Sequence, residues 1–202
     1  MNSPAASNGQ SLLETMFVLF VVAMLCSAAV SGLHMMQTRV RIQAAAEDML
    51  NTVLNARTEA LRREKRISIC VAAISSDAGA SVAPAETPAR CAGANAVQAV
   101  NSWQQGWLVF EDDNSNGMWD AGEILLMQHA SLKLPITARG NTTVNRYVSF
   151  GASGRSLALN GAFQAGTLTF CEHLAKASPG WLLVVNAVGR PRLEKTQISE
   201  CP

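Results

Sequence analysis

The first strong pattern in the chain is an apolar run near the amino terminus. Residues 1–9 carry no charged side chain, and the eighteen residues 16–33 contain none either. Eighteen residues in an α-helix rise about 27 Å, and Leu12 and Leu13 extend the run to about the thickness of the hydrocarbon core of a bilayer. The pattern predicts a single-pass transmembrane helix over residues 10–33.

A cleaved secretory signal peptide is the alternative for this segment. Such a peptide begins with basic residues, has a shorter apolar run and ends at a site of small residues. Residues 1–9 contain no Lys or Arg and the apolar run is longer, although the small residues 28–31 resemble a cleavage site. We therefore favour the retained helix.

A second helical pattern follows at once. Apolar residues recur at alternating steps of four and three, as on one face of an amphipathic helix. They are Ile42, Ala46, Met49, Val53, Ala56 and Ala60. No Pro or Gly interrupts residues 33–66, so we expect the membrane helix to continue over 34–66, with a Glu59–Arg63 ion pair on its polar side.

The periodicity becomes strand-like at Ile67. Short alternating or apolar runs, separated by turns rich in Gly, Asn and Ser, are typical of strands. The predicted strands are 67–71, 107–110, 124–128, 147–150, 167–171 and 181–188. The expected fold class is α+β: a long N-terminal helix followed by an antiparallel β-rich globular domain over 67–202, with a long Ala/Ser/Pro-rich loop at 75–98.

Composition narrows the function further. Apolar residues make up 49% of the 202 residues, which excludes a disordered chain. The net charge is only +1, so no global field attracts nucleic acid or anionic lipid. His34, His129 and His173 stand apart, no nucleophile has a base nearby in the sequence, and we expect no enzyme activity.

Five cysteines indicate an oxidising compartment. Cys26 lies within the apolar run, and the remaining four allow three pairings. Proximity in the sequence favours Cys70–Cys91 and Cys171–Cys201, and four reduced thiols are the alternative. Disulfides of this kind are typical of the periplasm or the cell exterior.

The segment around Glu14 resembles the type IV prepilin signature. Gly9 is followed by Gln10 and, at the fifth position after Gly9, by Glu14, the first charged side chain of the chain. The resemblance implies that a prepilin peptidase cleaves between Gly9 and Gln10 and methylates the new terminus. It also implies that Glu14 pairs with the N-terminal amine of a neighbouring subunit during assembly.

The rest of the chain resembles the FimT/GspH class of minor pilins and pseudopilins. The landmarks are Cys70, Cys91, the pattern W-x-x-G-W-L-V-F-x-D over 103–112, Val148–Phe150 with Gly154, 168–171 and 188–190. The resemblance implies a structural subunit at or near the tip of a type IV pilus or a type II secretion pseudopilus. Its partners would be other pilins, the prepilin peptidase and the inner membrane, with the C-terminal domain in the periplasm.

Residues 112–123 match a twelve-residue calcium-loop pattern. Oxygen-bearing residues stand at positions 1, 3, 5, 9 and 12, and a Gly stands at position 6. They are Asp112, Asn114, Asn116, Asp120 and Glu123. The alternative is a hairpin loop whose Asn and Asp side chains accept hydrogen bonds from its own backbone, and no cofactor is required in that case.

The motif Gly189-Arg190-Pro191-Arg192 is a candidate DNA-binding site. In a strand, Arg190 and Arg192 would face the same side, where two guanidinium groups suit phosphate oxygens. The motif resembles the tail of FimT proteins that bind DNA in natural transformation, which implies binding of double-stranded DNA without sequence preference. The alternative is a plain hairpin turn at Gly189. A second glycine-rich segment, 151–155, lacks the Lys-Ser/Thr of a phosphate loop, and we interpret it as a turn.

Overall fold

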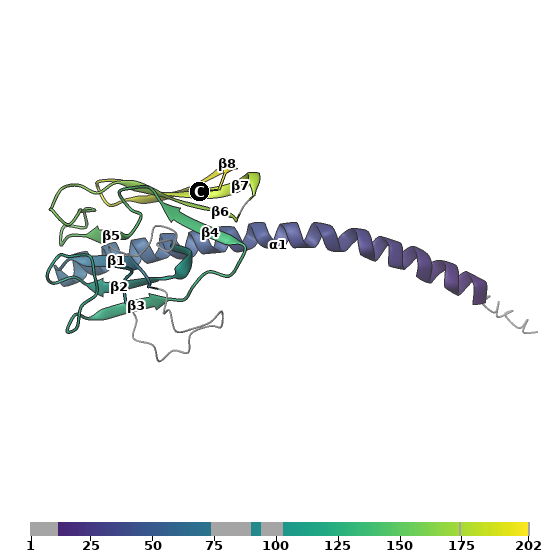
Figure 1. The fold of residues 1–202 in the computed structure, drawn as a ribbon, viewed down its shortest axis with the longest axis horizontal. Helices are drawn as coiled ribbons and strands as arrows, with labels where there is room; N and C mark the ends of the chain where they lie inside the picture. Colours follow the sequence, from purple (N-terminus) through teal and green to yellow (C-terminus); the bar gives the residue numbers. More distant parts are fainter. Residues whose placement is uncertain (1–11, 74–89, 94–102, 174, 202) are drawn as a thin grey trace, which may run out of the picture. The chain divides into compact units, whose positions relative to one another are not determined.

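The computed structural model of the protein describes residues 12–73, 90–93, 103–173 and 175–201, excluding the side chains of residues 28–35 and Lys176. Helix α1 runs without interruption from Leu12 to Arg63 (Figure 1). It ends where Glu64 adopts a φ of 55°, the left-handed conformation that often follows the last helical turn. Arg62 and Arg63 in that turn also suit the negative end of the helix dipole.

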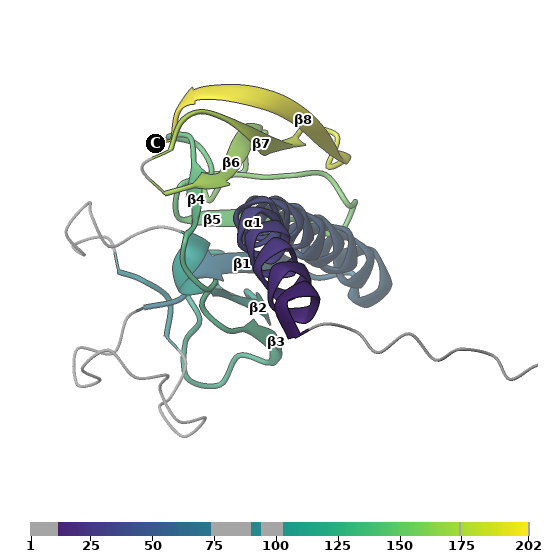
Figure 2. The same cartoon turned by 90° about the vertical axis from the view of Figure 1, so that its right-hand side faces the viewer.

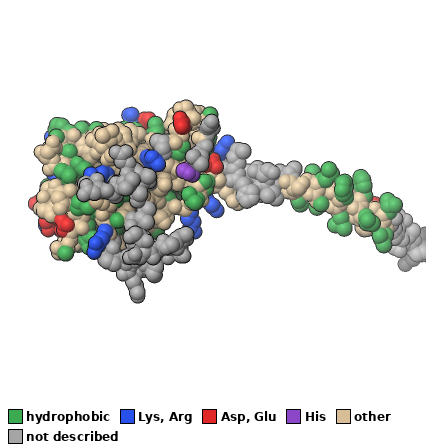
Figure 3. Space-filling view, viewed as in Figure 1, with side chains coloured by type: hydrophobic (Ala, Val, Ile, Leu, Met, Phe, Trp, Pro, Cys, Tyr) green, Lys and Arg blue, Asp and Glu red, His purple; other side chains and the backbone are tan. Residues whose placement is uncertain are grey.

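The chain forms two compact units, Met1–Thr38 and Arg39–Pro202. In the first unit, the large apolar side chains described between Leu12 and Leu25 are exposed; Leu12 is 77% exposed and Leu19 68%. These side chains appear in green along the first part of the helix in Figure 3. In the described part of the chain, no helix combines the length and the apolarity that a membrane span requires. The predicted transmembrane segment 10–33 lies partly outside the described residues.

The second unit is built around the remainder of α1. The six residues of the predicted stripe, Ile42 to Ala60, are all buried, and Ala45 and Thr52 are buried beside them. Glu59 and Arg63 form the expected ion pair. The amphipathic pattern therefore correctly identified the face of the helix that packs against the β-sheets.

Two four-stranded antiparallel sheets cover this helix face. The first has the order β3-β2-β1-β5, and the second has the order β4-β6-β7-β8. The strands of the first sheet are β1 (Ile67–Val71), β2 (Trp107–Glu111), β3 (Leu125–His129) and β5 (Tyr147–Phe150). Those of the second are β4 (Ile136–Gly140), β6 (Gly166–Glu172), β7 (Lys176–Val185) and β8 (Pro191–Glu200). Figure 2 shows β7 and β8 above the helix and β2 and β3 below it.

The second sheet differs from the sequence prediction. Strands β4 and β8 were not predicted, and β7 begins at Lys176 rather than near Trp181. Pro179 and Gly180 in β7 suggest a turn, yet Pro179 pairs with Gln197 of β8. Gly180 is required by packing, because a Cβ there would lie 2.1 Å from Cδ1 of Ile198 and 2.7 Å from the carbonyl oxygen of Phe170.

The core joins the helix to both sheets through large aromatic side chains. Trp103, in the short 3₁₀ helix η1 (Trp103–Gln105), is fully buried and donates its indole N–H to the carbonyl oxygen of Val144 at 2.9 Å. Trp107 is also fully buried and donates to Oγ1 of Thr52 on the helix at 3.2 Å. These polar contacts satisfy the indole groups inside an apolar core.

Candidate functional site

The prepilin-like segment is only partly described. Gly9 and Gln10, the predicted processing site, lie outside the described residues. Glu14 lies in the first turn of α1 and is exposed. An acidic residue in this position is favourable for the positive end of the helix dipole, and its side chain is accessible to a neighbouring molecule.

Both disulfides have the pairing that proximity in the sequence favours. Cys70 on β1 is bonded to Cys91, and Cys171 on β6 is bonded to Cys201 after β8. The first bridge closes the long loop, most of which lies outside the described residues. The second holds the carboxyl-terminal strand at its end. Cys26 is an exposed free thiol.

The 112–123 loop is held in shape by its own carboxylates. Asp112 is buried and accepts hydrogen bonds from the backbone N–H groups of Asn116 and Gly117, both at 3.0 Å, and from the hydroxyl of Ser68 at 2.6 Å. Glu123 accepts the backbone N–H groups of Asp113 and Asp120 at 3.1 and 3.0 Å.

The two asparagines complete this network. Asn114 and Asn116 donate their amide groups to one oxygen of Asp120 at 2.8 and 2.7 Å. These hydrogen bonds lower the pKa of Asp120, with the contribution of Asn114 the larger. Within the described ranges, no three His, Cys, Asp or Glu residues are grouped so that they could hold a metal ion. The contacts are those of the self-bonded hairpin loop, and calcium binding stays a prediction.

A buried carboxylate anchors the same loop to the end of the helix. Glu111, 3% exposed, is bound by the guanidinium of Arg63 and by the ammonium of Lys65, the latter at 2.9 Å. Lys65 also pairs with Asp113 at 3.1 Å. The hydrogen bond from Lys65, followed by that from Arg63, holds the pKa of Glu111 below its usual value despite burial. This group was not predicted from the sequence, because Glu111 lies 46 and 48 residues from its two partners.

Arg192 lies at the start of edge strand β8 and Arg190 directly precedes that strand; both are exposed. Arg192 pairs with Glu194 at 2.8 Å, two residues along the same face of the strand. The backbone N–H of Arg190 is held by Oδ1 of Asn186 at 2.8 Å, within the β7–β8 turn. The motif therefore combines a turn with two accessible guanidinium groups, one of them in an ion pair.

The turn at Gly189 touches the turn at 151–155, which the sequence did not indicate. A Cβ at Gly189 would lie 2.2 Å from the carbonyl oxygen of Gly154, so the two backbones are in close contact. The same oxygen accepts a hydrogen bond from Nε of Arg57 at 3.0 Å. The guanidinium of Arg155, the next residue, lies 4.2 Å from the ring centroid of exposed Phe163. Arg57 and Arg155 are thus added to the surroundings of Arg190.

Lys195, by contrast, does not extend this basic group. Lys195 pairs with Trp181 in the β7–β8 ladder, and residues 192 and 195 point to opposite faces of the strand because successive side chains alternate. The side chain of Lys195 faces helix α1 together with those of Trp181 and Gln197.

The two described histidines have structural contacts. His129 stacks on Trp107 with ring centroids 3.9 Å apart. Nδ1 of His173 lies 3.2 Å from Oγ1 of Thr137. The segment 151–155 is a turn closed by a hydrogen bond from the N–H of Gly154 to the carbonyl oxygen of Gly151 at 2.8 Å, as its sequence indicated.

Comparisons with known proteins agree with this architecture. The family model "Type II transport protein GspH" matches residues 45–189. The solved structure of the type IV minor pilin FimU of Pseudomonas aeruginosa (strain PAO1) aligns with a TM-score of 0.53 and 20% identity, covering 82% of this chain and 98% of FimU. A second crystal form of FimU gives a TM-score of 0.50 and 21% identity, covering 79% and 99%. These likenesses show the fold.

A third structure, the minor pseudopilin EpsH from the Type 2 Secretion System of Vibrio cholerae, aligns with a TM-score of 0.44 and 9% identity, covering 78% of this chain and 97% of EpsH. No curated protein sequence matches the chain significantly. The family model covers well over half of the chain, including α1 from residue 45 onward and the strands through β7. The chain therefore belongs to the GspH family, the class of minor pilins and pseudopilins that its sequence resembles.

Proposed function

We propose that the chain is a structural subunit of a type IV pilus or a type II secretion pseudopilus, incorporated at or near the tip. The observation that carries this proposal is the difference in burial between the apolar side chains of the two halves of α1. Its second half buries an apolar stripe in the β-rich unit, whereas the apolar side chains described between Leu12 and Leu25 remain exposed. Exposed apolar side chains of this number need lipid or neighbouring helices to cover them.

The same helix supports a proposal for how the subunit matures. The chain is held in the inner membrane as a single-pass protein by residues 10–33, with the β-rich unit in the periplasm, where both disulfides are stable. The prepilin peptidase removes residues 1–9 and methylates Gln10. Glu14 then pairs with the N-terminal amine of a neighbouring subunit, because an unpaired carboxylate among apolar helices is costly. The subunit needs no cofactor and performs no catalysis in this role.

Glu14→Ala, expressed from the native locus, tests this proposal. We expect it to be cleaved after Gly9, as mass spectrometry of the purified protein would show, but to be lost from sheared filaments. Glu47→Ala is the matched control, because Glu47 is an exposed glutamate of the same helix. Equal incorporation of the two variants would contradict the role of Glu14.

Deletion of the gene distinguishes between the two kinds of machine. Loss of pili would indicate a type IV pilus, and loss of protein export would indicate a type II secretion pseudopilus.

DNA binding is the second candidate function. It is supported by the contact between the turns at Gly154 and Gly189, which are followed in the sequence by Arg155 and Arg190. Arg57 donates a hydrogen bond to the carbonyl oxygen of Gly154 and adds a third cation. The pairing of Arg192 with Glu194 weakens it, because a phosphate must compete with that carboxylate. Two phosphate contacts give a slope of about −1.8 in a plot of log affinity against log salt, and a third contact from Arg155 gives about −2.7.

A titration of the protein with duplex DNA at several salt concentrations tests this candidate. We expect Arg190→Ala and Arg155→Ala each to weaken binding and to make the slope shallower by about one unit. Lys195→Ala is the control, because that side chain faces the helix from the other side of β8. Binding that does not depend on salt, or that survives loss of both arginines, would rule out this site.

A further inference from the structure

A groove lies between helix α1 and the edge of the second sheet. It has a volume of about 310 Å³ and remains open because β8 is the last strand of its sheet. Apolar side chains line one part of it, and polar or positively charged side chains line the other. We name it the Trp181 groove and define it by six lining residues: Ile42, Pro179 and Trp181, which are apolar, and Arg39, Lys195 and Gln197, which are polar.

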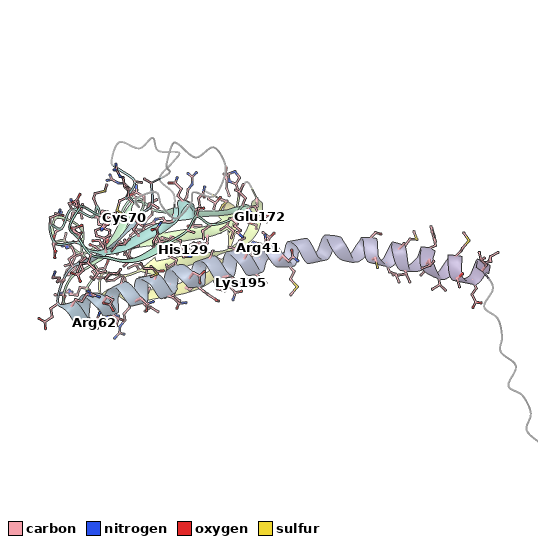
Figure 4. The ribbon with its side chains drawn as sticks, turned by 90° about the horizontal axis from the view of Figure 1, so that it is seen from below. Arg41, Arg62, Cys70, His129, Glu172 and Lys195 are labelled. Atoms are coloured by element: carbon pink, nitrogen blue, oxygen red, sulfur yellow. A yellow bond between two sulfur atoms is a disulfide. The ribbon has the colours of Figure 1, made fainter. Side chains whose placement is uncertain are left out.

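Lys195 is the cation that the Trp181 groove offers to a ligand. Its side chain is exposed, and in the part of the chain that the structure describes its ammonium forms no hydrogen bond or ion pair. Arg39 makes an interaction elsewhere in the chain and adds a second positive charge to the lining. None of the described side chains that line the groove is acidic, and Glu172, labelled at the same end of the unit in Figure 4, is not among them. The groove therefore suits a ligand that combines an anion with apolar groups.

The groove lies at the end of the second unit from which α1 leads to the apolar segment. Arg39 follows residue 33, the last residue of the proposed membrane span, by six residues, which is about 9 Å of helix. The headgroup region of a bilayer extends about 5–8 Å beyond the hydrocarbon core. Whatever the direction of the helix, this short connection keeps the groove close to the headgroups. Figure 4 shows Lys195 and Arg41 together at this end of the unit and Arg62 at the opposite end.

The side chains around the groove are of the kinds that favour a membrane surface. Trp is enriched where a bilayer meets water, because its ring is apolar and its N–H is polar. Trp181 is half-buried, and its indole N–H forms no hydrogen bond with any residue that the structure describes. Met36 and Val40, 65% and 56% exposed, continue the apolar surface of α1 up to the groove, and Arg41 beside them is exposed. This combination of Trp, cations and exposed apolar side chains matches the headgroup region of an anionic bilayer.

We propose that the Trp181 groove binds the headgroup of an anionic phospholipid while the subunit is held in the inner membrane. Lys195 and the side-chain amide of Gln197 bind the phosphate, and the glycerol and the first methylene groups of the lipid pack against Trp181 and Pro179. This inference rests on the proposed function, because it requires α1 to be inserted in a bilayer. The contact holds the β-rich unit at the membrane surface, and it is broken when the subunit leaves the membrane for the filament.

Quenching of Trp181 fluorescence tests this contact. The full chain would be placed in phosphatidylglycerol nanodiscs that contain some phospholipid with a nitroxide quencher on its headgroup. Trp103 and Trp107 are fully buried. Trp119 is half-buried like Trp181, but its loop is anchored through Lys65 to the other end of α1, about twenty helical residues or about 30 Å from the groove. We therefore expect quenching in the wild type and in Trp119→Phe, and its loss in Trp181→Phe.

The two faces of β8 supply a matched pair of charge variants. Lys195→Glu reverses the charge inside the groove, and Arg192→Glu makes the same change on the other face of the strand. Lys195→Glu is expected to lower the ratio of docked to undocked chains by about tenfold or more, and Arg192→Glu to leave it within about twofold. Lys195→Arg keeps the cation and should keep the quenching. Thermal unfolding checks that these variants remain folded.

The composition of the bilayer completes the test. Nanodiscs of phosphatidylcholine, whose headgroup carries no net charge, are expected to give less quenching of Trp181. Equal quenching in the two lipids, equal effects of the two glutamate variants, or quenching that persists in Trp181→Phe would each overturn the proposal. Reversal by excess inorganic phosphate at constant ionic strength would also overturn it, because the groove would then bind a free anion.

The same samples separate this inference from the proposed function. If the chain co-purifies with nanodiscs but Trp181 is not quenched, the lipid contact is wrong and the membrane anchor stands. If the chain does not enter nanodiscs, both the anchor and the lipid contact are wrong.

Discussion

At the scale of single residues, Glu111 shows how the loop at 112–123 is tied to the helix. Its carboxylate is buried and depends on Arg63 and Lys65 for compensation. We predict that Glu111→Gln lowers the free energy of unfolding by about 2 kcal/mol at pH 7, because two cations lose their shared partner. Urea unfolding followed by circular dichroism measures this change.

The effect of Glu111 should depend on pH with a definite sign. Its pKa in the folded protein lies below the ordinary value of 4.5, so its stabilisation is complete above that value and is lost as the pH falls through the lower, folded pKa. The difference between wild type and Glu111→Gln should therefore shrink below about pH 4.5. Glu200→Gln, at an exposed glutamate of β8, is the control and should change little at either pH. A difference that stays constant down to pH 3 would contradict this role.

Gly189 shows why a residue of the candidate DNA site is glycine. Its φ of 78° is unfavourable for other residues, and a Cβ would also meet the Gly154 oxygen at 2.2 Å. Gly161 has nearly the same φ of 82° but open space around the Cβ position. We predict that Gly161→Ala costs about 1–2 kcal/mol from backbone conformation alone, and that Gly189→Ala costs clearly more. Thermal unfolding of both variants measures the difference, and equal costs would show that the contact between the turns is unimportant.

At the scale of elements, those elements that bury a single apolar face against the core were predicted best from the sequence. The helix stripe from Ile42 to Ala60 was predicted because all its members face one core. Strand β8 was not predicted as such, because it is an edge strand whose sequence PRLEKTQISE carries only two large aliphatic residues, Leu193 and Ile198. Strand β4 ends in Arg139 and Gly140, which makes its pattern resemble a turn.

The prediction of the candidate sites from the sequence was limited for a different reason. Residues 112–123 have the same spacing in a calcium loop and in a self-bonded hairpin loop, so the sequence alone does not separate these two structures. The basic surroundings of Arg190 depend on Arg57 and on the turn at Gly154, which are 133 and 36 residues away in the sequence. Only the packing of α1 and the two turns brings these residues together.

The hydrogen bonds of the 112–123 loop predict that it folds without metal. Asp112 and Glu123 already accept backbone N–H groups from the loop, and Asp120 accepts two side-chain amides. We therefore expect EDTA to leave the melting temperature unchanged. A fall on chelation would contradict this expectation.

Calcium added in the millimolar range, where weak protein sites bind it, tests the remaining possibility for this loop. If the loop binds calcium, the melting temperature rises, and Glu123→Gln abolishes the rise because that residue would supply two ligand oxygens. Magnesium at the same concentration is the control for ionic strength and charge. A melting temperature that does not rise with calcium would show that the loop is a hairpin loop held by its own hydrogen bonds.

At the scale of the whole molecule, the family model and the fold agree with each other. The GspH family model begins at residue 45, inside α1, and the likeness to FimU covers 82% of the chain. The family model includes most of the amphipathic half of the helix together with the strands through β7. The helix is therefore part of the globular unit as much as it is a connection to the apolar segment.

This dual role of α1 predicts where the chain can be divided. A chain that starts at Arg39 keeps every helix residue that the structure describes as buried, and we expect it to unfold cooperatively with a melting temperature within a few degrees of the intact protein. A chain that starts at Ile67 lacks Ile42, Met49 and Val53, whose burial contributes on the order of 5–9 kcal/mol. That loss is comparable with the total stability of a typical domain, so the shorter chain should not fold. Near-ultraviolet circular dichroism measures this directly, because Trp107 is bonded to Thr52 of the missing helix. A cooperative unfolding transition in the shorter chain would show instead that the two sheets fold without α1 and that the helix only docks onto them.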